Sequence, residues 1–137
     1  MKIKCIAILD SQDCPIYLKT FDEKDEEMRY HYIAYTCCDS IEEKVRDQTS
    51  REMYLGLLQN VGALSMYGYM TNTMTKIILF VVTKTPPKSY EVNEIMKRIH
   101  SEYINVVSNP FYEFPTKIEN EQFDKKLLFL VQNIQNQ

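Results

Sequence analysis

One uninterrupted apolar run, Ile77–Val82, constrains the folding of this chain more than any other feature of its sequence. A helix that crosses a membrane needs about 20 apolar residues, so this run is far too short to span one. The run also lacks the alternation of apolar and polar residues that marks a strand with one solvent-exposed face. It is typical of a strand that is buried on both faces. We therefore expect Lys76–Thr83 to be a central strand, covered on each side by other elements or by a partner.

Four further segments, rich in aliphatic and aromatic residues and bounded by turn formers, carry strand patterns. The first two are predicted to form a hairpin, and the last two are predicted to join the central strand in a three-stranded meander. In chain order the four segments are Ile3–Leu9, Ile16–Phe21, Met53–Leu58 and Leu64–Met70.

Three segments have the spacing of amphipathic helices, with apolar residues three or four positions apart. The first begins near the acidic residues Asp25–Glu27, which suit a helix N-terminus, and runs to about Asp47. The predicted core-facing residues are Tyr30, Ala34, Cys37, Ile41 and Val45 in the first helix, Val92, Ile95, Met96, Ile99 and Tyr103 in the second, and Phe123, Leu127, Val131 and Ile134 in the third.

The predicted order of elements is two strands, a long helix, three strands and two helices. Because helices do not alternate with every strand, this order argues against a doubly wound parallel sheet. It indicates an α/β (α+β) fold of the longin-like or profilin-like type: a five-stranded mixed sheet with about three helices packed on its faces. The 137 residues suit one domain, and we expect residues 1–137 to form it.

Charge and glycine content exclude several functions. The formal net charge of −3 argues against binding to nucleic acid or to an anionic membrane through bulk charge. Gly56, Gly62 and Gly68 are the only glycines, and they cannot build a phosphate-binding loop. His31 and His100 have no metal-ligand companions at helical spacing. We therefore expect no catalytic residues, no cofactor and no metal.

The four cysteines are Cys5, Cys14, Cys37 and Cys38, and no C-x-x-C pair occurs among them. We interpret them as buried small apolar residues in a reducing compartment. The N-terminal residues have no signal-peptide pattern, and no apolar run in the sequence is long enough to span a membrane. These features predict a cytoplasmic protein.

Several strings of the sequence occur together in the order of a known family. They are Met53–Leu58, Tyr67–Asn72, Ser108–Tyr112, Phe123–Lys125 and the helical segment Ala34–Lys44. Together they resemble the sedlin family of subunits of the transport protein particle (TRAPP) complex, in particular its subunit-2-like branch. The resemblance covers essentially the whole chain.

This resemblance implies a non-catalytic adaptor with a longin-like fold. TRAPP tethers vesicles in endoplasmic reticulum to Golgi and Golgi transport, and the assembled complex is an exchange factor for Rab-type GTPases. The expected partners are other TRAPP subunits and, through the complex, a Rab-type GTPase. The expected location is the cytoplasm, at endoplasmic reticulum and Golgi membranes through the complex. The alternative is a longin-like carrier of a small apolar ligand.

The candidate interface lies on the polar side of the first helix. The resemblance implies that Asp39 belongs to a docking surface for a neighbouring subunit. Tyr32 is expected to point outward, because closely spaced tyrosines on one helix cannot all face the core. The remaining members of this candidate interface are Glu42, Glu43 and Arg46.

A second motif, formed by Asn109, Pro110, Phe111 and Tyr112, has a predicted structural role. Pro110 favours an extended conformation at the residue before it. We expect an aromatic ring of this motif to hold the preceding loop against the sheet. Direct recognition of a partner is the alternative role.

Overall fold

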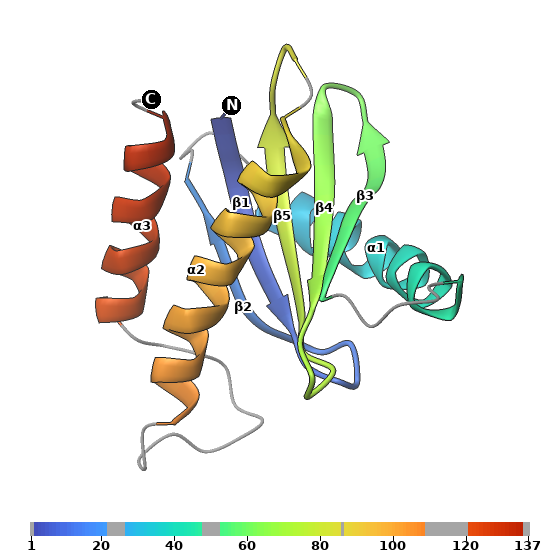
Figure 1. The fold of residues 1–137 in the computed structure, drawn as a ribbon, viewed down its shortest axis with the longest axis horizontal. Coiled ribbons are helices and arrows are strands. Elements are labelled where there is room, and N and C mark those ends of the chain that lie inside the picture. Colours follow the sequence, from blue (N-terminus) through green and yellow to red (C-terminus); the bar gives the residue numbers. More distant parts are fainter. Residues whose placement is uncertain (1, 22–26, 48–52, 86, 109–120, 136–137) are drawn as a thin grey trace.

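The structure is a computed structural model that describes residues 2–21, 27–47, 53–85, 87–108 and 121–135. Eight elements follow one another in the predicted order (Figure 1). They are β1 Lys2–Leu9, β2 Pro15–Thr20, α1 Glu27–Asp47, β3 Tyr54–Val61, β4 Leu64–Met70, β5 Lys76–Val82, α2 Ser89–Val107 and α3 Glu121–Gln135.

The five strands form one sheet in the order β2-β1-β5-β4-β3. Every pairing in it is antiparallel, so the predicted mixed sheet is wrong in this respect. The reason lies in the connection made by α1, which joins β2 to β3. These two strands run in the same direction, but they lie at opposite edges of the sheet and never pair.

The central strand β5 is buried on both faces, as its apolar run predicts. Ile77, Leu79 and Val81 face the helices α2 and α3, whereas Ile78 and Phe80 face α1. Figure 1 shows the resulting three layers, with α1 on one side of the sheet and α2 and α3 on the other. Each side has its own apolar core, and β5 contributes to both.

Helix α1 buries most of the predicted stripe against the sheet. Tyr30, Ala34, Cys37 and Ile41 are buried, and the ring of Tyr30 meets that of Phe80 edge to face at 5.2 Å between centroids. Val45 departs from the prediction, because 40% of its surface is exposed. It lies in the last turn of α1, beyond the part of the helix that the sheet covers.

The stripes predicted for the last two helices are confirmed where the side chains are described. All five residues of α2 are buried, as are Phe123, Leu127 and Val131 of α3. The side chain of Ile134 lies outside the described part of the structure. Helix α3 is fixed to β2 by Tyr17, whose ring packs on Phe123 at 4.8 Å between centroids and whose hydroxyl donates to Asp124 Oδ1 at 2.6 Å.

Two of the family-like strings are partners in one ladder. Met53–Leu58 and Tyr67–Asn72 lie largely on β3 and β4, where Gly56 pairs with Gly68. Gly56 has a φ of 80°, a left-handed conformation that glycine adopts without a steric penalty, and register shifts flank it. β3 also continues to Val61, beyond its predicted end at Leu58, because the connection to β4 is a tight turn at Gly62.

Asn109, Pro110, Phe111 and Tyr112 lie outside the described residues, so their predicted structural role stays a prediction. None of the helices in the described ranges is both long and apolar enough to cross a membrane.

Candidate partner interface

The outward face of α1 carries all five residues of the predicted interface. Tyr32, Asp39, Glu42, Glu43 and Arg46 are each exposed. At the 100° rotation per residue of an α-helix, they lie within a sector of roughly 100°. The helix therefore presents them on a single face, opposite its buried stripe.

This face has an aromatic end and a charged end. Tyr32 is 71% exposed, and the same sector holds Tyr35, which is 69% exposed, and Met28, which is 80% exposed. Carboxylates and one guanidinium occupy the following turns, from Asp39 to Arg46. Tyr32 points outward. The helical spacing shows why Tyr35 does so too, since it lies three residues further along the same face.

Contacts on the buried side fix the orientation of the helix. Gln59 on β3 donates from Nε2 to the Thr36 hydroxyl at 3.0 Å and lies 3.1 Å from Cys37 Sγ. Thr36 in turn donates to the backbone carbonyl of Ile33 at 2.7 Å. Because these polar contacts are directional, they fix the rotation of α1 about its own axis relative to the sheet. The outer face of α1 therefore points away from the sheet in a defined orientation.

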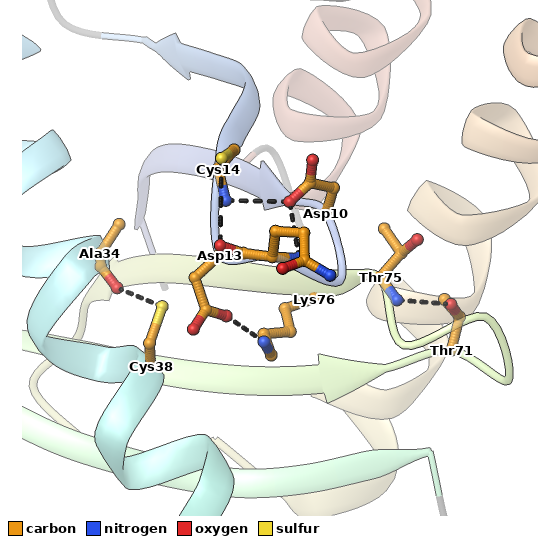
Figure 2. A network of polar contacts seen from close by, with 9 residues as sticks. Asp10, Asp13, Cys14, Ala34, Cys38, Thr71, Thr75 and Lys76 are labelled. Carbon is orange, nitrogen blue, oxygen red and sulfur yellow. Dashed lines mark hydrogen bonds and ion pairs between the residues drawn. The ribbon is translucent and has the colours of Figure 1, made fainter. Parts of the chain in front are cut away.

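A polar network at one end of the sheet was not predicted from the sequence (Figure 2). The buried carboxylate of Asp10 accepts hydrogen bonds from the backbone N–H groups of Gln12 and Cys14, each at 2.9 Å. Asp13 has a φ of 63° and forms an ion pair with Lys76, the first residue of β5. The network joins the β1–β2 loop to the centre of the sheet.

Cys38 of α1 belongs to the surroundings of this ion pair (Figure 2). Its thiol donates to the Ala34 carbonyl at 3.6 Å. Burial first, and the nearby Asp13 carboxylate second, raise the pKa of this thiol to about 11. The thiol therefore stays protonated at neutral pH, and the network holds elements in place without supplying a nucleophile.

Hydroxyl groups extend the polar region towards α2. The hydroxyl oxygen of Thr73 lies 2.9 Å from that of Thr71 and 3.2 Å from that of Thr75. The Thr75 hydroxyl also lies 3.4 Å from the Tyr103 hydroxyl. They line an open pocket together with His100. The ring of His100 packs against Tyr69, and burial lowers its pKa, as expected of a packed histidine.

This pocket and a second one, between α2 and α3, are relevant to the alternative of an apolar-ligand carrier. Hydroxyl side chains and His100 line the first, and charged side chains line much of the second. Apolar side chains also line both, Ile104 and Val107 in the first and Phe129 and Leu130 in the second. An enclosed apolar cavity would favour such a carrier, and neither of these two pockets is enclosed.

The described residues bring no metal-binding set together, since no group of three or more His, Cys, Asp and Glu side chains among them is placed to hold an ion. The cysteines are free, and Cys5, Cys37 and Cys38 are buried as predicted. The prediction is wrong for Cys14, which is exposed because it lies in the turn before β2.

The sequence profile of the sedlin family matches residues 8–133. The chain belongs to the sedlin family. It is 32% identical over 138 residues to a trafficking protein particle complex subunit 2-like protein of Dictyostelium discoideum, covering 97% of this chain and 99% of that protein. The proteins of the same name from Bos taurus and Rattus norvegicus are 29% and 30% identical, each over 88% of this chain and 90% of the relative.

The chain also has a structural relative in the signal recognition particle receptor SRb-GTP/SRX complex from Chaetomium thermophilum. The two superpose with a TM-score of 0.58, over 98% of this chain and 99% of the other, at 17% sequence identity. At this identity the likeness shows the fold alone. It confirms the longin-like fold predicted from the order of elements.

Proposed function

We propose that this sedlin domain is a non-catalytic adaptor subunit of the TRAPP vesicle-tethering complex, and that it docks on a neighbouring subunit through the outer face of α1. It would act in endoplasmic reticulum to Golgi and Golgi transport, where it contributes to the assembly of a Rab exchange factor. It would be cytoplasmic and reach these membranes only through the complex. The relatives named as subunit 2-like proteins support the assembly, and the exposed face of α1 supports the mode of docking.

The observation that carries the proposal is the composition of this face. An interface core favours aromatic side chains with a polar tip, and charged groups at its rim set specificity and association rate. Tyr32 and Tyr35 suit such a core, and Asp39, Glu42 and Glu43 suit an acidic rim. Tyrosines this exposed bring little stability to the folded chain itself, which leaves them available to a partner.

The experiment is a binding assay between the purified chain and purified TRAPP subunits, offered singly and as subassemblies. Tyr32→Ala removes an exposed ring and Asp39→Arg reverses a rim charge. We expect the first to weaken binding by about tenfold or more, as for an interface residue worth at least about 1.4 kcal/mol. The second should chiefly slow association and make binding less sensitive to salt.

Helix α2 provides matched controls, because Tyr90 is 63% exposed and Glu94 is an exposed carboxylate. Tyr90→Ala and Glu94→Arg should leave binding unchanged, and all four variants should unfold like the parent chain. Equal losses from the α1 and α2 variants would reject α1 as the docking face. Failure of the folded parent to bind any TRAPP subunit or subassembly would reject the adaptor role.

A further inference from the structure

An open groove runs between α2 and α3, on the side of the sheet away from α1. It has a volume of about 450 Å³, and Phe129 and Leu130 provide its apolar surface. Phe129 is 65% exposed, although the adjacent residues on the inner side of α3, Leu127 and Val131, are buried. Exposed aromatic surface in a hollow is typical of a site that receives an apolar side chain.

The charges of this groove are opposite in sign to the net charge of the chain. Arg98, Lys125 and Lys126 line it, against one carboxylate, that of Glu102. Lys126 is 3.3 Å from Glu102 and is therefore engaged. Arg98 and Lys125 form no ion pair with any residue that the structure describes. The groove is thus a local basic site on a chain with a net charge of −3.

We propose that the α2/α3 groove binds an acidic segment of a protein partner, which inserts one apolar side chain beside Phe129 and presents carboxylates to Arg98 and Lys125. A guanidinium is suited to this role, because its planar donors match a carboxylate in a bidentate arrangement. Lys125 supplies a second positive charge on the opposite wall. The apolar insertion provides affinity, and the two cations select the acidic sequence.

The shape of the site favours a peptide segment over a lipid surface. A groove between two helices accepts a side chain from a narrow segment, whereas a bilayer meets a broad convex or flat basic face. The site is separate from the outer face of α1, since the sheet lies between them, and the proposal does not depend on the docking of α1.

The test begins with selection of a displayed library of random peptides on the purified chain. A synthetic peptide of the enriched sequence is then titrated by fluorescence polarisation. The variants are Phe129→Ser and the double charge reversal Arg98→Glu/Lys125→Glu. Leu128→Ala and Lys97→Glu are matched controls, because both residues are exposed on the same helices but outside the groove.

We expect the enriched sequences to combine an aromatic or leucine residue with neighbouring aspartates or glutamates. Each groove variant should raise the dissociation constant of the synthetic peptide by about tenfold or more, with the controls unchanged. Higher salt should weaken binding to the parent chain more than binding to the charge-reversed one.

Four results would overturn the proposal. The enriched peptides could lack acidic residues, or bind the groove variants as tightly as the controls. The parent chain could sediment with phosphatidylserine vesicles in a manner lost on charge reversal, which would assign the groove to a membrane. Ultracentrifugation could show self-association that Phe129→Ser abolishes, which would assign it to a second copy of the chain.

Discussion

At the scale of single residues, the least expected feature is a lysine at the start of the central strand. Lys76 has only 7% of its side chain exposed, and Asp13 from the β1–β2 loop is its ion-pair partner. A buried ion pair adds little to stability relative to an apolar pair, but the loss of one partner leaves an uncompensated charge. The pair therefore fixes the loop to the sheet more than it strengthens the fold.

The Asp13–Lys76 pair predicts a non-additive result. Asp13→Asn keeps a side chain that tolerates a positive φ but removes the charge, and should destabilise the fold by about 3 kcal/mol. Lys76→Met should also be destabilising. Asp13→Asn/Lys76→Met together should cost less than the sum, as measured by urea denaturation in a double-mutant cycle. Additive costs would show that the two charges are not coupled.

The buried thiols predict a loss of stability in alkali. Burial raises the pKa of Cys37 and of Cys38 from 9.0 to about 11. Since the folded state favours the protonated thiols, their contribution to stability is complete below pH 9 and is lost as the pH rises through 11. The free energy of unfolding should therefore fall over this range.

The matched protein for this measurement is Cys37→Ala/Cys38→Ala. The variant should be less stable at pH 8 because it loses buried volume, yet its stability should change less between pH 9 and 11. Tyrosines such as Tyr17, whose pKa burial also raises, titrate in both proteins. Urea denaturation of both proteins between pH 9 and 11 gives the contribution of the two thiols as the difference between their free energies of unfolding. If that difference stayed constant across the range, the prediction would be contradicted.

At the scale of elements, α3 depends on a small set of contacts with the sheet. Its three described core residues pack on the α2 side of the sheet, and Tyr17 of β2 holds its first turn through Phe123 and Asp124. The acceptor Asp124 is a carboxylate near a helix N-terminus, where the helix dipole favours negative charge. The first turn of α3 is therefore the point at which its docking can be tested.

Tyr17→Phe keeps the ring contact and removes the hydroxyl that donates to Asp124. We expect a loss of about 1.5–3 kcal/mol in the free energy of unfolding, typical of a hydrogen bond to a charged acceptor. Hydrogen exchange should become faster in α3, with α1 unaffected. Tyr90→Phe, at an exposed position of α2, is the control and should change neither measurement. Uniformly faster exchange would argue against a local role.

At the scale of the whole molecule, the three layers keep the two surfaces apart. The outer face of α1 lies beyond one core, and the α2/α3 groove lies beyond the other. The central strand β5 contributes to both cores, so disruption of its packing would affect both surfaces. A variant confined to one surface should affect only that surface, which is why the two binding experiments can succeed or fail independently.

The sequence by itself determined the order of elements, the central position of β5 and the buried faces of the helices. It did so because these features follow local periodicity. Six apolar residues in a row indicate a strand that is buried on both faces, and apolar residues three or four positions apart indicate a helix that is buried on one face. The family-like strings also identified the family, because they occur in its order from Ala34 to Lys125. The family profile matches residues 8–133.

Only the tertiary structure decided the features that depend on residues far apart in the sequence. The antiparallel pairing of β1 with β5, the Asp13–Lys76 pair and the groove between α2 and α3 are of this kind. Lys76 and Arg98 are ordinary cations in the sequence. Whether each is buried with a partner or exposed in a groove depends on which elements the fold places against it, and local patterns do not contain that information.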